Sequence, residues 1–343
     1  MRRPVKKARE SWRAHWLVIT AHKFTCRMAF RAMFLPLCKA DPTKCAAVGK
    51  LVGKGKYCRV YKFDARKAIR FSRSEGMVKR QWPSLFAHEL VVRIPLSDAA
   101  QDTAQEGAAL MASVPPHPCI ERADPLTDVL GVELYREFHE TLKAALQRTR
   151  ASTGNLSWVD VCHIAAPLFD ALVHLHQHKR VHADIKAENL LVKWADHAKS
   201  HWATAAIVVT DVDLVARIDT YAPGRGTPGH ADPQAFKTGG RYAKDIEHTQ
   251  ASEIFRDECA MVAAMDVYSA CVTLGYEVGL GCALSPEAMR DLVDADRTNG
   301  ALRDKLMCDA GWPEAAADAC VSGLVENRRK RLTLDALRAV FVA

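Results

Sequence analysis

The segment VHADIKAENLLV, residues 181–192, decides how the rest of the chain is interpreted. It places Asp184, Lys186 and Asn189 in one short stretch between a helical pattern and an apolar run typical of a strand. These three side chains suit phosphoryl transfer. The carboxylate can accept the proton of an attacking hydroxyl, the ammonium can neutralise charge on the moving phosphoryl group, and the amide oxygen can bind Mg²⁺.

A second acidic residue follows an apolar strand pattern further along the chain. The run IVVTDVDLVA, residues 207–216, places Asp211 at the point where this strand would end. A carboxylate that emerges from a buried strand is a suitable second oxygen ligand for a divalent cation. The sequence therefore predicts a metal-assisted site to which two separate segments contribute.

Together with further segments, these two stretches resemble the eukaryotic-type protein kinases of the Ser/Thr branch. HADIKAEN is similar to the family's catalytic loop H-R-D-x-K-x-x-N, and Asp211 is similar to the acid of D-F-G. The resemblance runs from about residue 48 to residue 340, with its motifs in the family's order. The other matches are HPCI (117–120) to H-P-N-I, GTPGHADPQ (226–234) to the end of the activation segment, DVYSACVTLGYE (266–277) to the helix that opens D-x-W-S-x-G, and RLTLDAL (331–337) to the R-x-T end of the domain.

The resemblance implies a fold and a domain organisation. The fold class is α+β, in a bilobal protein-kinase-like arrangement with a β-rich N-lobe over 46–137 and an α-helical C-lobe over 138–343. A basic extension over 1–45 precedes this kinase domain. The residue patterns indicate a strand, tight turn and strand over 46–63, strands over 67–72, 89–96 and 129–138, a helix over 98–112, and long helices from 156 onward.

The same resemblance implies an activity, namely ATP-dependent phosphoryl transfer to Ser/Thr hydroxyls of protein substrates, with ATP and Mg²⁺ as cofactors. By the motif match, Asp184 is the catalytic base and Lys186 is the lysine on the phosphate side. Asn189 and Asp211 are the Mg²⁺ ligands by the same match. Asp266 is expected to brace the catalytic loop from below.

The resemblance also assigns residues to the nucleotide. VGKGKYCRV resembles the family's glycine-rich loop, in which Gly53 and Gly55 would let backbone N–H groups approach phosphate. Val60 would cover the adenine face. Glu137 and His139 fall between the two lobes, where the family has a hinge that bonds adenine through backbone groups.

The lysine of the family's third strand is replaced by arginine. Two stretches compete for this strand, KAIR ending at Arg70 and LVVR ending at Arg93. We favour Arg93, because 13 residues separate it from Glu106, the candidate αC glutamate, whereas 36 separate Arg70 from it. An arginine keeps the charge of lysine but is planar, forked and bulkier, so the exchange is not neutral.

Several positions depart from the family's motifs. Ala183 replaces the arginine of H-R-D, which makes regulation by loop phosphorylation doubtful. Asp213 stands where D-F-G has glycine, and a register in which Asp213 is the metal ligand stays open. Gln234 replaces the glutamate that pairs with an arginine, here Arg331. An insertion over 193–206 is predicted to be a solvated hairpin extension.

Composition bounds the partners and the location. The 343 residues carry a net charge of +8, and the first 31, with nine basic residues and one acid, account for all of it. The remaining body is neutral, so we expect no specific nucleic-acid partner. No run of 18 apolar residues occurs, so no transmembrane segment is predicted. The 11 cysteines form no C-x-x-C pair, which favours reduced thiols and an intracellular location, in the cytoplasm or nucleus.

The basic tail is open to several interpretations. Its Arg-rich, acid-poor and aromatic composition fits a mitochondrial presequence, a membrane-surface helix or a nuclear signal, and also an extension without an address.

Three functions compete for the chain. The first is an active Ser/Thr kinase, in which a small hydroxyl at Thr227 near Asp184 and Lys186 fixes the floor of a site for aliphatic alcohols. The second is a pseudokinase, a nucleotide-binding or scaffolding module, which the arginine at the third strand, Asp213 and Gln234 favour. The third, a small-molecule phosphotransferase, is disfavoured by the GTPG and DVYSAC segments. The departures resemble those of divergent kinases, such as those of large DNA viruses.

Overall fold

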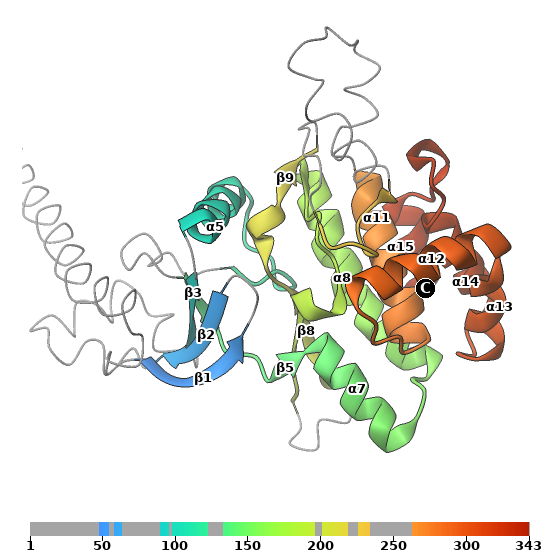
Figure 1. Cartoon of the computed structure of the whole chain (residues 1–343), viewed down its shortest axis with the longest axis horizontal. Helices are drawn as coiled ribbons and strands as arrows, with labels where there is room; N and C mark the ends of the chain where they lie inside the picture. The colour runs from blue at the N-terminus through green and yellow to red at the C-terminus, as the bar shows by residue number, and fades with distance from the viewer. Residues whose placement is uncertain are drawn as a thin grey trace, which may run out of the picture. The chain divides into compact units, whose positions relative to one another are not determined.

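The computed structural model combines helix and strand, with 57% of the interpretable residues helical and 13% in strands. It describes residues 48–54, 58–63, 90–95, 98–122, 133–195, 201–218, 226–233 and 263–342 (Figure 1). These proportions agree with the predicted α+β class. The described residues fall into two compact units, the first comprising those up to 101 together with 133–137, and the second comprising 102–122 and those from 138 onward.

The first unit is built on a four-stranded antiparallel sheet. Its strands follow the order β1 (Val48–Lys54), β2 (Cys58–Phe63), β3 (Leu90–Pro95) and β4 (Glu133–Arg136). The register sets Val60 opposite Gly53 on one side and opposite Arg93 on the other. Strands predicted over 46–63, 89–96 and 129–138 are therefore confirmed in their described parts. The strand predicted over 67–72 lies outside the described residues.

Helix α5 (Asp98–Ala112) spans the residues that its Ala- and Gln-rich composition predicts. From Asp102 onward it groups with the second unit, which differs from the expected lobe division at residue 137. Gly107 shows why. A Cβ placed there would lie 2.4 Å from the Val212 carbonyl oxygen and 2.8 Å from the Asp213 Cα, so the helix backbone packs directly against that segment. A side chain would push the two apart.

Helices form most of the second unit. In chain order they are α7 (Leu142–Thr153), α8 (Trp158–Gln177), α11 (Ala263–Val272) with its π-helical continuation η5 (Thr273–Gly279), α12 (Pro286–Asn299), α13 (Ala301–Cys308), α14 (Glu314–Gly323) and α15 (Leu334–Phe341). Two small antiparallel sheets complete it, with the strands β5 (Glu140–Thr141), β7 (Leu190–Lys193) and β8 (Ala206–Val209) in one, and β6 (Arg180–Val181) and β9 (Ala216–Arg217) in the other.

Helix α8 forms the centre of the second unit. Ser157 and Asp160 cap its start in a reciprocal capping box, which satisfies backbone N–H groups of the first turn. Its apolar residues recur at helical spacing, and eight of its side chains are buried. The helix packs against α11 and α15 (Figure 1, green, orange and red). The predicted long helix after residue 156 is confirmed.

Among the described residues, α8 alone is long and apolar enough to cross a membrane when judged by length and composition. Its buried face shows that it serves here as a core helix, and such helices commonly pass this test. This finding is consistent with the predicted lack of a transmembrane segment.

Two tryptophans of the insertion over 193–206 are more buried than predicted. β7 and β8 pair as an antiparallel hairpin, as expected, but Trp194 and Trp202 are only 4% and 2% exposed. Their rings meet edge to face with centroids 4.7 Å apart, and the Trp194 Nε1–H donates to Glu140 Oε1 at 2.6 Å. The prediction of a solvated extension is therefore wrong for these two residues, because large aromatic rings gain more from packing than from exposure.

A buried ion pair fixes the segment that ends at residue 233. Arg331 Nη1 lies 2.5 Å from Asp232 Oδ2, and neither side chain is exposed. Arg328, in the short helix η6 (Arg328–Lys330), donates to the same oxygen at 2.8 Å. The acidic partner of Arg331 is therefore Asp232, two residues before the position that the motif assigns. Gln234 lies outside the described residues.

Replacing Asp232 with Asn should lower the free energy of unfolding by about 3–5 kcal/mol, because two guanidinium groups lose a buried counter-charge. Burial alone would raise the pKa of Asp232, but Arg331 and Arg328 outweigh it and hold the pKa below its ordinary value of 3.8. The stabilisation is thus present above about pH 4 and lost as the pH falls below the ordinary pKa. Urea unfolding at neutral and acidic pH measures both effects.

Arg338→Ala is a matched control. Arg338 pairs with Asp170, but these side chains are 42% and 41% exposed, so the loss should stay below about 1 kcal/mol. Equal losses for the two variants would contradict the role given to Asp232.

Candidate functional site

Residues 182–189, called here the 182–189 loop, connect β6 to β7 and end in the short helix η2 (Ala187–Asn189). The loop rests on Asp266 of α11. The two carboxylate oxygens of this fully buried residue accept the backbone N–H groups of His182 at 2.8 Å and Ala183 at 2.9 Å. Its Oδ2 also lies 2.9 Å from His176 Nε2. The prediction that Asp266 braces this loop is confirmed.

The brace holds the backbone in an unusual conformation. Ala183 has a φ of 67°, in the left-handed region that costs a residue with a Cβ about 1–2 kcal/mol. Such a conformation persists only where the surroundings fix it, and here the Ala183 N–H is bonded to a buried carboxylate. The next residue, Asp184, consequently turns into a polar cluster.

Asp184 lies at the centre of this cluster. Its Oδ2 accepts from Lys186 Nζ at 2.8 Å and from Asn189 Nδ2 at 2.9 Å, and its Oδ1 accepts from Thr227 Oγ1 at 2.7 Å. Lys186 Nζ also donates to Thr227 Oγ1 at 2.6 Å. The predicted proximity of a hydroxyl to Asp184 and Lys186 is confirmed. Four side chains from two segments therefore form one closed network.

The charge state of Asp184 follows from its neighbours. Burial alone would raise the pKa of this 6%-exposed carboxyl, but the Lys186 ammonium and the hydrogen bonds from Lys186 and Thr227 outweigh it. The pKa therefore lies below the ordinary value, and the group is ionised at neutral pH. An ionised carboxylate is the state that can accept a proton.

Strand pairing brings Asn189 close to the segment that carries Asp211. Leu190 of β7 lies opposite Val209 of β8, and the Thr210 N–H donates to the Asn189 carbonyl at 2.9 Å. The His182 ring spans the same gap, because its Nε2 lies 3.0 Å from the Thr210 carbonyl oxygen. The two predicted metal ligands thus leave neighbouring strands at the same end of the sheet.

The backbone at Asp211 also singles out this residue. Its φ of 61° and ψ of 57° are left-handed, a conformation that Asp adopts more readily than most residues. Asp213, in contrast, lies in the short helix η4 (Val212–Leu214). The absence of glycine at position 213 therefore imposes no strain there, because the left-handed residue of this segment is Asp211.

The remaining predicted residues are distributed over both units. In the first unit, Gly53, Val60 and Arg93 lie in one row across β1, β2 and β3, while Gly55 is outside the described residues. Arg70, the alternative to Arg93, is also outside them. In the second unit, Glu106 lies on the exposed side of α5, one residue before the buried Gly107.

The two residues predicted to lie beside adenine, Glu137 and His139, already have partners. Glu137 forms an ion pair with Lys62, with 2.9 Å between Oε1 and Nζ. The His139 N–H donates to the Val192 carbonyl at 3.0 Å, and its Nδ1 accepts the Trp194 N–H at 3.0 Å. The backbone N–H of His139 is therefore already used and is not free for the predicted bond to adenine.

The sequence interpretation missed one acidic residue beside this network. Glu277 of η5 is 5% exposed, and its Oε2 accepts the Ala187 N–H at 2.9 Å. A signal was present, because Asp266 and Glu277 are the only charged residues between positions 266 and 282. Acids inside an otherwise apolar helix must find donors when they are buried.

The histidines and acids in the described part of the chain do not gather into a metal site built from His, Cys, Asp or Glu side chains. No group of three or more His, Cys, Asp or Glu side chains there is placed to hold an ion. The histidine run of α8 is used for packing and bonding instead: His176 bonds Asp266, and His174 bonds the Pro115 carbonyl at 2.9 Å.

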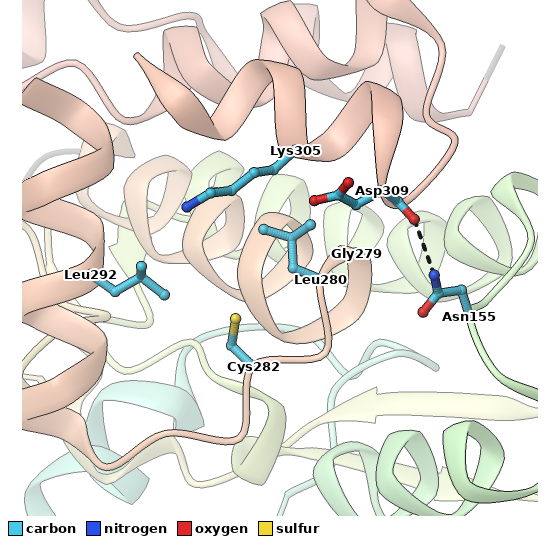
Figure 2. Close-up of a pocket in the computed structure, with 7 residues that line it drawn as sticks. All are labelled: Asn155, Gly279, Leu280, Cys282, Leu292, Lys305 and Asp309. Carbon is cyan, nitrogen blue, oxygen red and sulfur yellow. Dashed lines mark hydrogen bonds between the residues drawn. The ribbon is translucent and has the colours of Figure 1, made fainter. Parts of the chain in front are cut away.

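A cavity of about 310 Å³ lies in the second unit, away from the 182–189 loop. Figure 2 shows its lining residues, which are Asn155, Gly279, Leu280, Cys282, Leu292, Lys305 and Asp309. Burial raises the pKa of the Cys282 thiol, so it stays protonated. Lys305 Nζ is bonded to both carboxylate oxygens of Asp296, at 2.8 and 3.0 Å. The cavity therefore presents neither a thiolate nor an unpaired ammonium, and we assign it no chemistry.

Replacing Asp266 with Asn should destabilise the chain by roughly 1–3 kcal/mol, because one backbone N–H then faces an amide NH₂ group instead of an oxygen. Hydrogen exchange at the His182 and Ala183 amides should become faster, since both N–H groups depend on this carboxylate. Exchange measured by NMR or mass spectrometry tests this. Asp296→Asn removes a buried acid elsewhere in the unit and should leave these two amides unchanged; a similar change in both variants would contradict the assignment.

Comparison with known proteins does not assign the chain to a family. A scan against protein-family models gives no match, and a search of curated proteins gives none. Its function therefore rests on the geometry of the described residues.

Proposed function

We propose that the chain is a protein kinase of the Ser/Thr branch, with the bilobal fold of that family. It would transfer the γ-phosphoryl group of ATP to a Ser or Thr hydroxyl of a protein substrate. The observation that carries the proposal is the closed network of Asp184, Lys186, Asn189 and Thr227. A base, a cation and a metal-binding amide held in fixed positions are what phosphoryl transfer requires, since most of its catalysis is positioning and charge neutralisation.

In this proposal Asp184 orients the attacking hydroxyl and takes its proton as the new O–P bond forms and the bond to the leaving diphosphate breaks. Its lowered pKa keeps the carboxylate ionised at neutral pH, the state in which it can orient the hydroxyl and accept a proton. Lys186, 2.8 Å from Asp184 Oδ2, neutralises charge on the transferred group. Thr227 bonds both side chains and so ties the segment that would face the substrate to the reacting groups.

The donor set suits Mg²⁺. The Nδ2 of Asn189 donates both to the carbonyl oxygen and to Oδ2 of Asp184. The Asn189 Oδ1 makes neither of these two hydrogen bonds. Asn189 Oδ1 and the Asp211 carboxylate are hard oxygen ligands, and Mg²⁺ is commonly held by one or two such groups together with phosphate oxygens. When bound, the ion would neutralise negative charge that develops on the phosphates.

The first unit supplies the residues that we assign to the nucleotide. Gly53, Val60 and Arg93 lie opposite one another across three strands, and directly opposed residues present their side chains on the same face of a sheet. A glycine, an apolar cover and a cation on one face suit phosphate and adenine. Arg93 lies in this row on β3. The kinase family has a lysine on its third strand that binds phosphate, and Arg93 would take that place.

Arg93 also favours the alternative, a pseudokinase that binds nucleotide without transferring phosphate. A forked, planar guanidinium cannot occupy the same space as an ammonium, so phosphates can be held in a position that is wrong for transfer.

Purified protein incubated with γ-labelled ATP, Mg²⁺ and a Ser/Thr-containing protein mixture should transfer label, and Asp184→Asn should reduce the rate by about 10²–10⁴-fold, because the proton acceptor is lost. A thermal-shift titration with ATP and Mg²⁺ runs in parallel. Equal background transfer by both proteins would overturn the kinase proposal, and a thermal shift without transfer would support the pseudokinase.

Asp211→Asn should abolish Mg²⁺-dependent transfer and the Mg²⁺-dependent part of the thermal shift, because the carboxylate is the proposed ligand. Asp213→Asn is the matched control, two residues away in η4, and should keep most of both signals. The reverse result would move the metal ligand to Asp213.

A further inference from the structure

One face of the helix formed by α11 and η5 follows the 182–189 loop. Asp266, Thr273 and Glu277 are spaced seven and four residues apart, which places them on the same side of a helix. Asp266 holds the amides of residues 182 and 183, Thr273 Oγ1 lies 3.5 Å from the Ile185 carbonyl, and Glu277 holds the Ala187 amide. Successive residues of the helix thus contact successive residues of the loop.

Glu277 is the contact nearest to the groups that would hold phosphate and metal. Ala187, whose N–H it accepts, follows Lys186 directly and precedes Asn189 by two residues. The Glu277 side chain is 5% exposed, and a buried carboxylate is costly unless it is matched by donors. This cost makes the Ala187 contact a strong constraint on the loop.

A second segment reaches the same carboxylate. Glu277 Oε2 lies 3.2 Å from Nε2 of His230, a residue of the segment that carries Thr227. The orientation of the ring is not that of a hydrogen bond, and neither ring nitrogen makes one with the residues that the structure describes. The contact therefore brings the segment and the loop to one buried carboxylate.

The π-helical turn accounts for the position of this charge. All seven residues of η5 are buried, and the Leu280 N–H bonds the Gly275 carbonyl five residues back. A π-turn accommodates an extra residue within a helix, and such turns occur frequently at functional sites. Here the widened turn carries Glu277 beside the loop.

We propose that Glu277 is a positioning residue for phosphoryl transfer, which sets Lys186 and Asn189 through the Ala187 N–H and draws the Thr227 segment toward the loop through His230. This proposal rests on the proposed kinase function. Glu277 contacts neither Asp184 nor Lys186 in the described network, so it acts through the backbone of the loop.

The test compares Glu277→Ala, Glu277→Gln and the control Asp296→Asn in the full chain. Glu277→Ala should lower kcat by about 100-fold, the loss typical of a small misplacement of reacting groups, with little change in KM for ATP. Glu277→Gln keeps an acceptor oxygen for the Ala187 N–H and should recover most of kcat. Asp296→Asn removes a buried acid that is 3% exposed and paired with Lys305, and should leave kcat unchanged.

Hydrogen exchange at the Ala187 amide provides a readout that does not need activity. It should speed up in Glu277→Ala but not in Glu277→Gln or the control. If the wild-type protein transfers no phosphate while this exchange pattern holds, the kinase proposal fails and the anchoring of the loop by Glu277 stands. Unchanged exchange in Glu277→Ala, or a loss of kcat in Asp296→Asn as large as in Glu277→Ala, would overturn the positioning role.

Discussion

The candidate site depends on the buried carboxylate of Asp266. A fully buried charge must be met by fixed donors, and here two of them are consecutive backbone N–H groups. The relation works in both directions. The carboxylate needs the two amides, and the amides hold Ala183 in a left-handed conformation that it would otherwise leave. Because Asp184 follows Ala183, this single interaction determines where the central acid of the network points.

The Thr227 segment is held by the same kind of interaction at three places. Thr227 bonds Asp184 at one end, Asp232 pairs with Arg331 and Arg328 at the other, and His230 lies beside Glu277 between them. Each place matches a buried acid with groups from a distant part of the chain. Loss of one partner leaves a charge without compensation, so these contacts specify the arrangement more strongly than they add to net stability.

Local features could be predicted from residue patterns, and two distant partners, Asp266 and Thr227, from the resemblance, whereas the other long-range partners could not. The bounds of α5 and the buried face of α8 follow from propensity and periodicity, and the 182–189 loop follows from the spacing of Asp184, Lys186 and Asn189. The pairing of Arg331 with Asp232 was not predicted, because spacing along one segment does not show which acid reaches a distant cation, and Gln234, which the motif assigns to this position, lies outside the described residues. The burial of Trp194 and Trp202 could not be predicted for the same reason, because both belong to the large apolar core, to which distant elements such as α8 also contribute.

The replacement at Ala183 gives these anchors a further meaning. In the kinase family that we propose for the chain, an arginine at this position would receive a phosphorylated loop, whereas Ala183 offers no charge. Here the Thr227 segment already reaches Asp184 and Lys186 through neutral and charged contacts that need no phosphate. The acids that fix it, Asp232 and Glu277, are part of the buried interior. An arrangement held by buried charges is formed when the chain folds, so under the proposed kinase function the described contacts of residues 226–233 need no modification step.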